Sequence, residues 1–348
     1  MNAKTKLHSL RAVAVAAGIL ALLVIAFFTA YYVLARAPAA IPSAGLLVTV
    51  RDGSGASLVA RELEGAGAIR HSWVFRALAR LKGSQALLKA GTYRIGPEMG
   101  TLEVLDLLVS GKQALVRVTV PEGYTLRQTA ALLEKSGVCP ADAFLAAASD
   151  PAILTAENLP SASLEGYLFP DTYFLPASYD PHEAARIMVT AFRRRLAEAI
   201  PESAELSPRQ LNDRVILASI VEREYRMADE APIIASVFYN RIRIGMALQS
   251  CATVVYVLTE KLGRPHPDSI HDRDLKIKDP YNTYLQRGLP PGPICSPGLT
   301  SLEAVFRPAA TKYLYFRLVD PAAGRHHFSA TFEEHNQAAD LVVKRIGG

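Results

Sequence analysis

A long uncharged segment near the N-terminus constrains this chain more than any other feature. Residues 12–35 contain no charged side chain over 24 positions. A helix needs about 20 apolar residues to cross a bilayer, whereas the apolar core of a cleavable secretory signal has only about 7–15. We therefore expect an uncleaved transmembrane helix over 12–35, in preference to the buried core helix of a soluble protein.

The charges that flank this segment predict its orientation. Lys4, Lys6 and Arg11 precede it, and Arg36 is the one basic residue close behind it. Basic residues favour the cytoplasmic side of a membrane. Residues 1–11 are therefore expected to form a cytoplasmic tail in a single-pass protein whose other residues lie outside the cytoplasm.

The composition excludes several classes of protein. Half of the 348 residues are apolar and 20% are charged, so the chain has enough apolar side chains to bury a core. At about 150 residues per domain the length predicts roughly two domains. The net charge of +5 gives no support to nucleic-acid binding, and three cysteines exclude a disulfide-rich scaffold. No Cys-x-x-Cys or His-Glu-x-x-His pattern occurs, so we expect no metal and no other cofactor.

An internal repeat occupies part of the first half. Residues 48–67 and 118–137 align without a gap at an offset of 70, and eight of the 20 positions are identical. Each copy predicts a short strand, a glycine turn, an amphipathic helix and a glycine that ends the helix. Between the copies we expect a strand over 89–95 and a helix over 101–110 that stops at Gly111. Small βααβ modules of this kind either bind glycan strands or serve as rigid spacers, and the spacing alone leaves both readings open.

The expected domain order follows from these patterns. The fold class is α+β, with a linker at 36–45, a small α+β module at 46–115 and a second repeat unit at 116–160. The second repeat unit leads into a mixed α/β domain at 161–346.

The best candidate for a chemically active helix lies in that last domain. Ser207 is a good N-cap and Pro208 suits the first helical position, so we expect a helix from Leu211 to about Met227. Glu222 and Glu224 are about 200° apart on such a helix and cannot share one site. Glu222 follows the small residues at 218–219, which leave room for a ligand. There, burial would raise the carboxyl pKa and allow general acid catalysis, although helix geometry alone favours an ordinary solvated glutamate.

A rigid loop follows downstream. Residues 280–298 contain eight glycines or prolines and should form neither helix nor strand. Residues 281–284 offer aromatic faces and neutral hydrogen-bonding groups, which suit sugar rings but also an ordinary tyrosine-rich turn.

Seven ordered motifs, taken together, resemble one family. They are LEGYLFPDTY at 164–173, LASIVERE at 217–224, ASVFYNRIRIGMALQS at 235–250, YNTY at 281–284, GLPPGPI at 288–294, the segment 308–316 and a late His-Phe with His-Asn at 327–336. The chain is similar over residues 10–345 to the YceG-like endolytic murein transglycosylases of bacterial inner membranes.

The resemblance implies a reaction. Such enzymes cleave the β-1,4 bond between N-acetylmuramic acid and N-acetylglucosamine within a glycan strand, and this would end the elongation of nascent strands. The C6 hydroxyl of the muramic acid attacks its own anomeric carbon and leaves a 1,6-anhydro end. One carboxyl group therefore suffices, whereas hydrolytic glycosidases use two.

The resemblance also implies site residues and partners. Glu222 corresponds to the catalytic glutamate, and Glu165 is expected to line the cleft or orient a neighbour. Candidates for binding sugar hydroxyls or N-acetyl groups are Asn240, Gln249, Thr253, Tyr281, Asn282 and Tyr284. The first-half modules resemble LysM-like units, which favours glycan contact. The expected partners are peptidoglycan strands, the inner membrane and peptidoglycan synthases (penicillin-binding proteins), with the catalytic domain in the periplasm.

One segment departs from the family pattern. Many relatives have Asp-Pro where this chain has Cys251-Ala252, and a second cysteine, Cys295, lies in the proline-rich loop. We expect these two to form a disulfide that leaves Cys139 free.

Two other functions remain compatible with the sequence. One is a non-catalytic glycan-binding scaffold of the cell-wall synthesis machinery, and the other is a hydrolytic muramidase that uses water.

Overall fold

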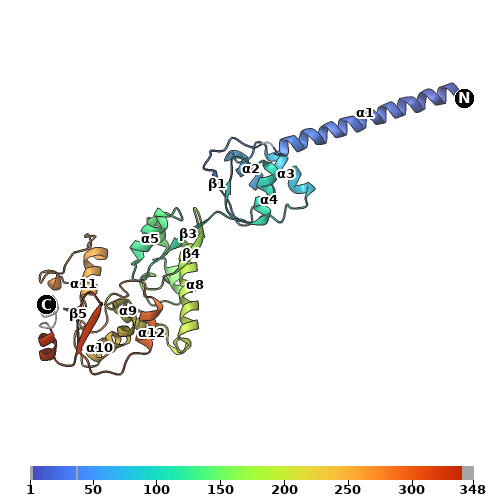
Figure 1. Ribbon diagram of the computed structural model, residues 1–348. Coiled ribbons are helices and arrows are strands. Elements are labelled where there is room, and N and C mark those ends of the chain that lie inside the picture. The colour runs from blue at the N-terminus through green and yellow to red at the C-terminus, as the bar shows by residue number, and fades with distance from the viewer. Residues whose placement is uncertain (1–2, 37, 339–348) are drawn as a thin grey trace. The chain divides into compact units, whose positions relative to one another are not determined.

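A computed structural model describes the backbone of residues 3–36 and 38–338, and the side chains from residue 15 onward within these ranges (Figure 1). The described chain combines helices with three two-stranded sheets, which confirms the α+β class. It divides into two compact units. The first runs up to Leu115 and includes residues 176–178, and the second holds residues 116–175 and the chain from Tyr179 onward.

The first unit begins with the predicted apolar helix. Helix α1 (Ala3–Arg36) is continuous, and its segment Val15–Arg36 is the one described helix long and apolar enough to cross a membrane. Figure 1 shows most of α1 projecting away from the other helices of this unit.

The rest of the first unit consists of three helices and one antiparallel pair of strands. Strand β1 (Leu46–Val50) pairs antiparallel with β2 (Gly91–Ile95). The helices are α2 (Ala56–Gly65), α3 (Ser72–Leu81) and α4 (Thr101–Ser110). As predicted, α4 ends at Gly111, whose positive φ of 73° suits a glycine C-cap.

The expected linker at 36–45 is part of this fold. Ala35 is buried in the core, and Arg70 Nε donates a hydrogen bond to Pro38 O at 2.7 Å. Gly100 lies so close to α1 that a Cβ there would come within 2.7 Å of the Arg36 backbone. The apolar helix therefore runs directly into the packed core of the first unit.

The second copy of the repeat folds like the first. Strand β3 (Leu115–Thr119), α5 (Leu126–Lys135), α6 (Ala141–Ala147), α7 (Pro151–Ala156) and β4 (Thr172–Pro176) follow in order, and β3 pairs with β4. Matching threonines join the strands in each copy: Thr49 and Thr92 Oγ1 lie 3.0 Å apart, and Thr119 and Thr172 Oγ1 lie 2.9 Å apart. The sequence thus predicted the strand and helix of each copy and the strand that became β2, and the tertiary structure adds β4.

Helices form most of the second unit. They are α8 (Pro181–Ala199), α9 (Pro208–Glu222), α10 (Ala231–Arg243), α11 (Cys251–Tyr256) and α12 (Leu299–Phe306), with short turns at Pro201–Glu205, Ala228–Glu230, Val257–Lys261 and Asp274–Lys276. Strands β5 (Tyr315–Asp320) and β6 (Arg325–Ser329) form an antiparallel hairpin. The α/β domain expected here is therefore largely helical among the described residues. Helix α9 is buried continuously from Val215 to Val221.

The end of α9 differs from the sequence expectation. The helix stops at Glu222, five residues before Met227. Arg223 N donates to Ile220 O and Glu224 N donates to Val221 O, so the last turn tightens into i→i+3 bonding. This tightening gives Glu222 and Glu224 different surroundings.

Candidate functional site

Glu222 lies where the end of α9 meets the start of α12. Its Oε2 accepts hydrogen bonds from Gly298 N at 2.9 Å and from Ser301 Oγ at 2.5 Å. Gly298 is the N-cap of α12 and Ser301 is in its first turn. The carboxyl group is thus held by two donors at a helix N-terminus, where negative charge is favoured.

Burial gives this carboxyl group an unusual protonation equilibrium. Removal from water raises the pKa of Glu222, and the charge of Glu122 raises it further. The hydrogen bonds from Ser301 and Gly298 and the charge of Arg223 oppose this rise. The net direction is upward, as required of a group that donates a proton near neutral pH.

A second carboxylate approaches from a distant part of the sequence. The loop at 121–124 is fixed by bonds from Gly123 N to Ser296 O and from Ser296 N to Tyr124 O, at 2.9 and 2.8 Å. The Glu122 side chain lies against Gly298, because a Cβ on that glycine would collide with its carboxyl group. Helix spacing could not reveal Glu122, since it lies 100 positions before Glu222.

Glu224 occupies a separate environment. It accepts a hydrogen bond from Ser250 Oγ, and burial raises its pKa to about 7. Because Glu222 and Glu224 have different partners, the expectation that they do not share one site is confirmed.

The space expected over Ala218 and Ser219 is filled, whereas Glu222 itself is only partly buried. Ser219 Oγ accepts from Ile294 N at 3.0 Å, and Cys295 Sγ lies 3.2 Å from Ser219 O. The prediction that Ala218 and Ser219 leave room for a ligand is therefore wrong, because the proline-rich loop packs on these small residues.

Glu165 is buried and joins two elements. Its Oε1 accepts from Leu126 N at the start of α5 (2.9 Å), and its Oε2 accepts from Tyr256 Oη in α11 (3.4 Å). Burial raises the pKa of Glu165 to about 8. Its two hydrogen bonds thus connect α5 with α11.

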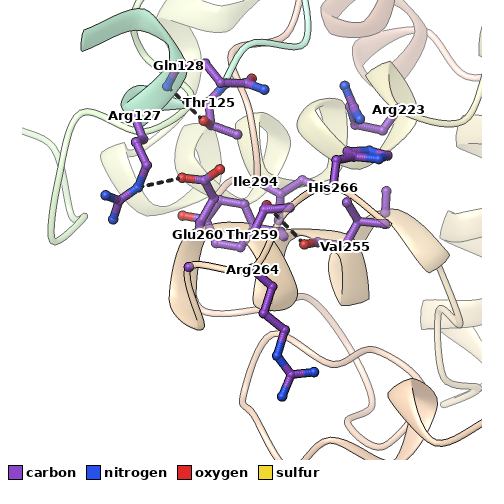
Figure 2. Close-up of a pocket in the computed structure, with 13 residues that line it drawn as sticks. Thr125, Arg127, Gln128, Arg223, Val255, Thr259, Glu260, Arg264, His266 and Ile294 are labelled. Carbon is purple, nitrogen blue, oxygen red and sulfur yellow. Dashed lines mark hydrogen bonds and ion pairs between the residues drawn. The ribbon is translucent and has the colours of Figure 1, made fainter. Parts of the chain in front are cut away.

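Tyr256 is one of the residues that line a cavity of about 350 Å³, which Figure 2 shows in close-up. Figure 2 shows Arg127 paired with Glu260, and Arg223 and His266 also line the cavity. Glu222 does not line this cavity, but Arg223, the next residue, does. The aromatic face and charged rim offer contacts suited to a polar ring-shaped ligand.

Three of the expected binding residues serve the fold. The Asn240 amide donates to Thr311 O and Tyr313 O, and the Asn282 amide donates to Leu275 O and Ile277 O. Thr253 Oγ1 donates to Ser250 O. These side chains are buried, and their hydrogen bonds fix the loops of the second unit.

The other three expected binding residues are more accessible to solvent. Gln249 is exposed at a positive φ of 51°, a conformation that its residue type rarely adopts. Tyr281 lies against Tyr256 with ring centroids 5.1 Å apart, and Tyr284 Oη lies 3.0 Å from Cys251 Sγ. Tyr281 and Tyr284 are partly buried and keep part of each ring at the surface.

The expected disulfide between Cys251 and Cys295 is wrong for this structure. All three cysteines are free: Cys251 is exposed, whereas Cys139 and Cys295 are buried. Cys295 points at the backbone of α9 and Cys251 points at Tyr284, so each thiol has a different partner. The described residues also contain no cluster of three or more candidate metal ligands.

Glu165 yields a prediction for stability. Its pKa is about 8 in the folded chain, above the usual value of 4.5, so between these pH values only the folded state holds the proton. The unfolding free energy of the wild type should therefore fall relative to Glu165→Gln as pH rises from 5 to 8, by up to about 1.4 kcal/mol per pH unit. Denaturant unfolding across this range measures the difference, and parallel pH curves for the two proteins would contradict the prediction.

Comparison with known proteins identifies the family. The model of the YceG-like family matches residues 48–341. An endolytic murein transglycosylase of Streptococcus pneumoniae is 30% identical over 321 residues, which cover 83% of this chain and 57% of that protein. One of Bacillus subtilis is 30% identical over 314 residues, 85% of this chain and 84% of that protein. The chain thus spans a little over half the length of the pneumococcal relative.

A solved structure agrees with these matches. The crystal structure of a YceG-like protein from Listeria monocytogenes is 30% identical, with a TM-score of 0.56, and covers 85% of this chain and 99% of that one. The family match, the relatives and the solved structure agree, and the chain belongs to the YceG-like family.

Proposed function

We propose that this protein is an endolytic murein transglycosylase. It would cleave the β-1,4 bond between N-acetylmuramic acid and N-acetylglucosamine within a strand and leave a 1,6-anhydro end. The observation that carries the proposal is the Glu222 carboxyl group, partly buried, raised in pKa and held by Gly298 N and Ser301 Oγ. The names of the relatives from Streptococcus pneumoniae and Bacillus subtilis support it.

The mechanism uses one carboxyl group twice. Protonated Glu222 gives its proton to the bridging oxygen as the glycosidic bond breaks. The carboxylate that results is stabilised by the two donors at the start of α12. It then takes the proton of the muramic acid C6 hydroxyl as this oxygen bonds to the anomeric carbon, so no water is consumed.

One observation favours a second candidate, hydrolysis by water. Hydrolytic glycosidases use a pair of carboxyl groups, and Glu122 lies near Glu222. In that reaction Glu122 would be the base or the nucleophile.

The products separate these two reactions. Purified peptidoglycan strands are incubated with the full chain, and the fragments are measured by mass spectrometry. We expect ends that are one water molecule lighter than hydrolytic ends. Fragments with free reducing ends would refute the transglycosylase proposal and support hydrolysis.

Ser301 yields a prediction for the pH dependence. Its hydrogen bond favours the charged form of Glu222, so Ser301→Ala should raise the Glu222 pKa further. The alkaline limb of kcat/KM against pH should then move upward by about one to two pH units, because a hydrogen bond to a charged group contributes about 1.5–3 kcal/mol. Thr300→Ala removes a neighbouring hydroxyl and should leave that limb unchanged.

The location and partners form part of the proposal. The α1 helix would anchor the enzyme in the inner membrane with its catalytic unit in the periplasm. The two repeat units would act as LysM-like glycan contacts, and Gln249, Tyr281 and Tyr284 would hold sugar rings. An enzyme placed there would meet new strands beside peptidoglycan synthases.

A further inference from the structure

Helix α3 has an outer stripe whose composition is unusual for a solvent-exposed face. Val74, Phe75, Leu78 and Ala79 are buried in the first unit. The opposite stripe carries Trp73, Arg76, Ala77, Arg80 and Leu81, which recur at the i, i+3, i+4, i+7 and i+8 positions of one helix face. Trp73 is 46% exposed and Leu81 is 69% exposed.

This stripe forms a groove with the apolar helix. Phe27, Phe28 and Tyr31 of α1 line the same groove of about 610 Å³ as Trp73 and Leu81. The rings of Tyr31 and Trp73 lie 6.4 Å apart. The lining contains two arginines and no carboxylate.

The length of α1 indicates how deep this groove would lie in a bilayer. From Ala12 to Phe27 there are 16 residues, which make a helix only about 24 Å long at about 1.5 Å per residue. The hydrocarbon core of a bilayer is about 30 Å thick. If α1 crosses a bilayer, the span must extend beyond Phe27, into the turns that carry the groove.

Packing contacts hold the rest of the first unit against the end of α1. Ala35 is buried in its core, and the close approach of Gly100 to Arg36 fixes the end of α1 against α4. The stripe on α3 therefore stays at the level of Phe27, Phe28 and Tyr31.

We propose that the Trp73–Leu81 stripe lies within the outer interfacial layer of the bilayer that α1 crosses. Trp73 and Leu81 insert beside the upper acyl chains, and Arg76 and Arg80 extend to the lipid phosphates. Tryptophan favours this layer because its ring is apolar and its N–H is polar, and arginine bends toward headgroups. The occupant of the groove is thus anionic lipid, and the first unit is held against the membrane surface. This proposal depends on the α1 span and not on the proposed reaction.

The single tryptophan of the chain provides the test. The full chain is reconstituted in vesicles of phosphatidylglycerol and phosphatidylethanolamine that contain brominated lipids. Bromines on the upper acyl chain should cause at least a roughly twofold loss of Trp73 emission, more than bromines near the chain end, because the ring lies at the interface. Aqueous acrylamide should quench it weakly.

Two reporter variants calibrate the depth. Trp73→Phe with Phe28→Trp places the reporter inside the α1 span, and Trp73→Phe with Phe332→Trp places it on the exposed surface of the second unit. The proposal would be overturned if Trp73 behaved like the Phe332→Trp reporter. In that case acrylamide would quench its emission strongly and brominated lipids would not quench it. Protection from acrylamide without bromine quenching would also overturn the proposal and would indicate a protein in the groove. Failure of bromines to quench the Phe28→Trp reporter would overturn it too.

Charge variants test the lipid contact. Arg76→Gln with Arg80→Gln should shift Trp73 emission to the red and reduce bromine quenching in anionic vesicles. The matched variant Lys82→Gln also removes a positive charge, but Lys82 pairs with Asp106 outside the groove, so it should leave emission unchanged. Equal effects of these two changes would contradict the phosphate contacts.

Discussion

Replacement of Glu222 by glutamine is expected to abolish cleavage of glycan strands. Glutamine keeps the size of the side chain and can accept the bonds from Gly298 N and Ser301 Oγ, but it cannot donate a proton to a leaving oxygen. General acid–base catalysis contributes about 100- to 10,000-fold, so the rate should fall by at least about 100-fold. Release of fragments from purified peptidoglycan measures the loss, and thermal unfolding checks that the variant is folded.

Two matched variants separate the possible mechanisms. Glu122→Gln removes the second nearby carboxylate, and a single-carboxyl reaction should retain activity within about tenfold. If Glu122→Gln were as inactive as Glu222→Gln, the pair would act together as in hydrolysis. Glu224→Gln removes a buried carboxyl group two residues away that contacts Ser250 instead. Unchanged fragment release by Glu222→Gln would refute the assignment of Glu222 as the proton donor.

Replacement of Gly166 by alanine is expected to destabilise the second unit severely. Gly166 has a φ of +84°, and an alanine Cβ there would lie 2.5 Å from Pro293 Cβ and 3.1 Å from Val215 Cγ1. The backbone conformation costs about 1–2 kcal/mol in an L-residue, and the overlap with a rigid proline adds about 1–3 kcal/mol. We expect a loss of about 3 kcal/mol or more in the free energy of unfolding, measured with denaturant.

Gly137→Ala is the control for this prediction. Gly137 has a similar φ of +74°, but nothing lies within 4 Å of a Cβ there. Only the backbone cost should appear, about 1–2 kcal/mol. Equal losses at the two glycines would show that the contact with the proline-rich loop contributes nothing.

Local patterns predicted the elements that depend on neighbouring residues. The run at 12–35, the glycine stop at 111 and the N-cap at Ser207 all correspond to observed features of α1, α4 and α9. The repeat predicted two strand–turn–helix units, because the glycine turn and the apolar helix face are encoded within about 20 residues.

Patterns were less informative where a residue's partner lies far along the chain. The side-chain amides of Asn240 and Asn282 were predicted to bind the substrate. In the structure they donate hydrogen bonds to backbone carbonyl groups instead. The disulfide between Cys251 and Cys295 assumed that two segments meet through their cysteines, whereas one thiol faces α9 and the other faces Tyr284.

Sequence alone thus determined the membrane-length helix, the two repeat units and the N-cap of α9. Each of these depends on the order of apolar, small and capping residues within a few turns of chain. Only the tertiary structure brought Ser301, Gly298 and Glu122 to Glu222 and closed the space over Ser219. Those contacts join segments 75 to 100 residues apart. The packing of whole helices and loops, which no local pattern encodes, decides them.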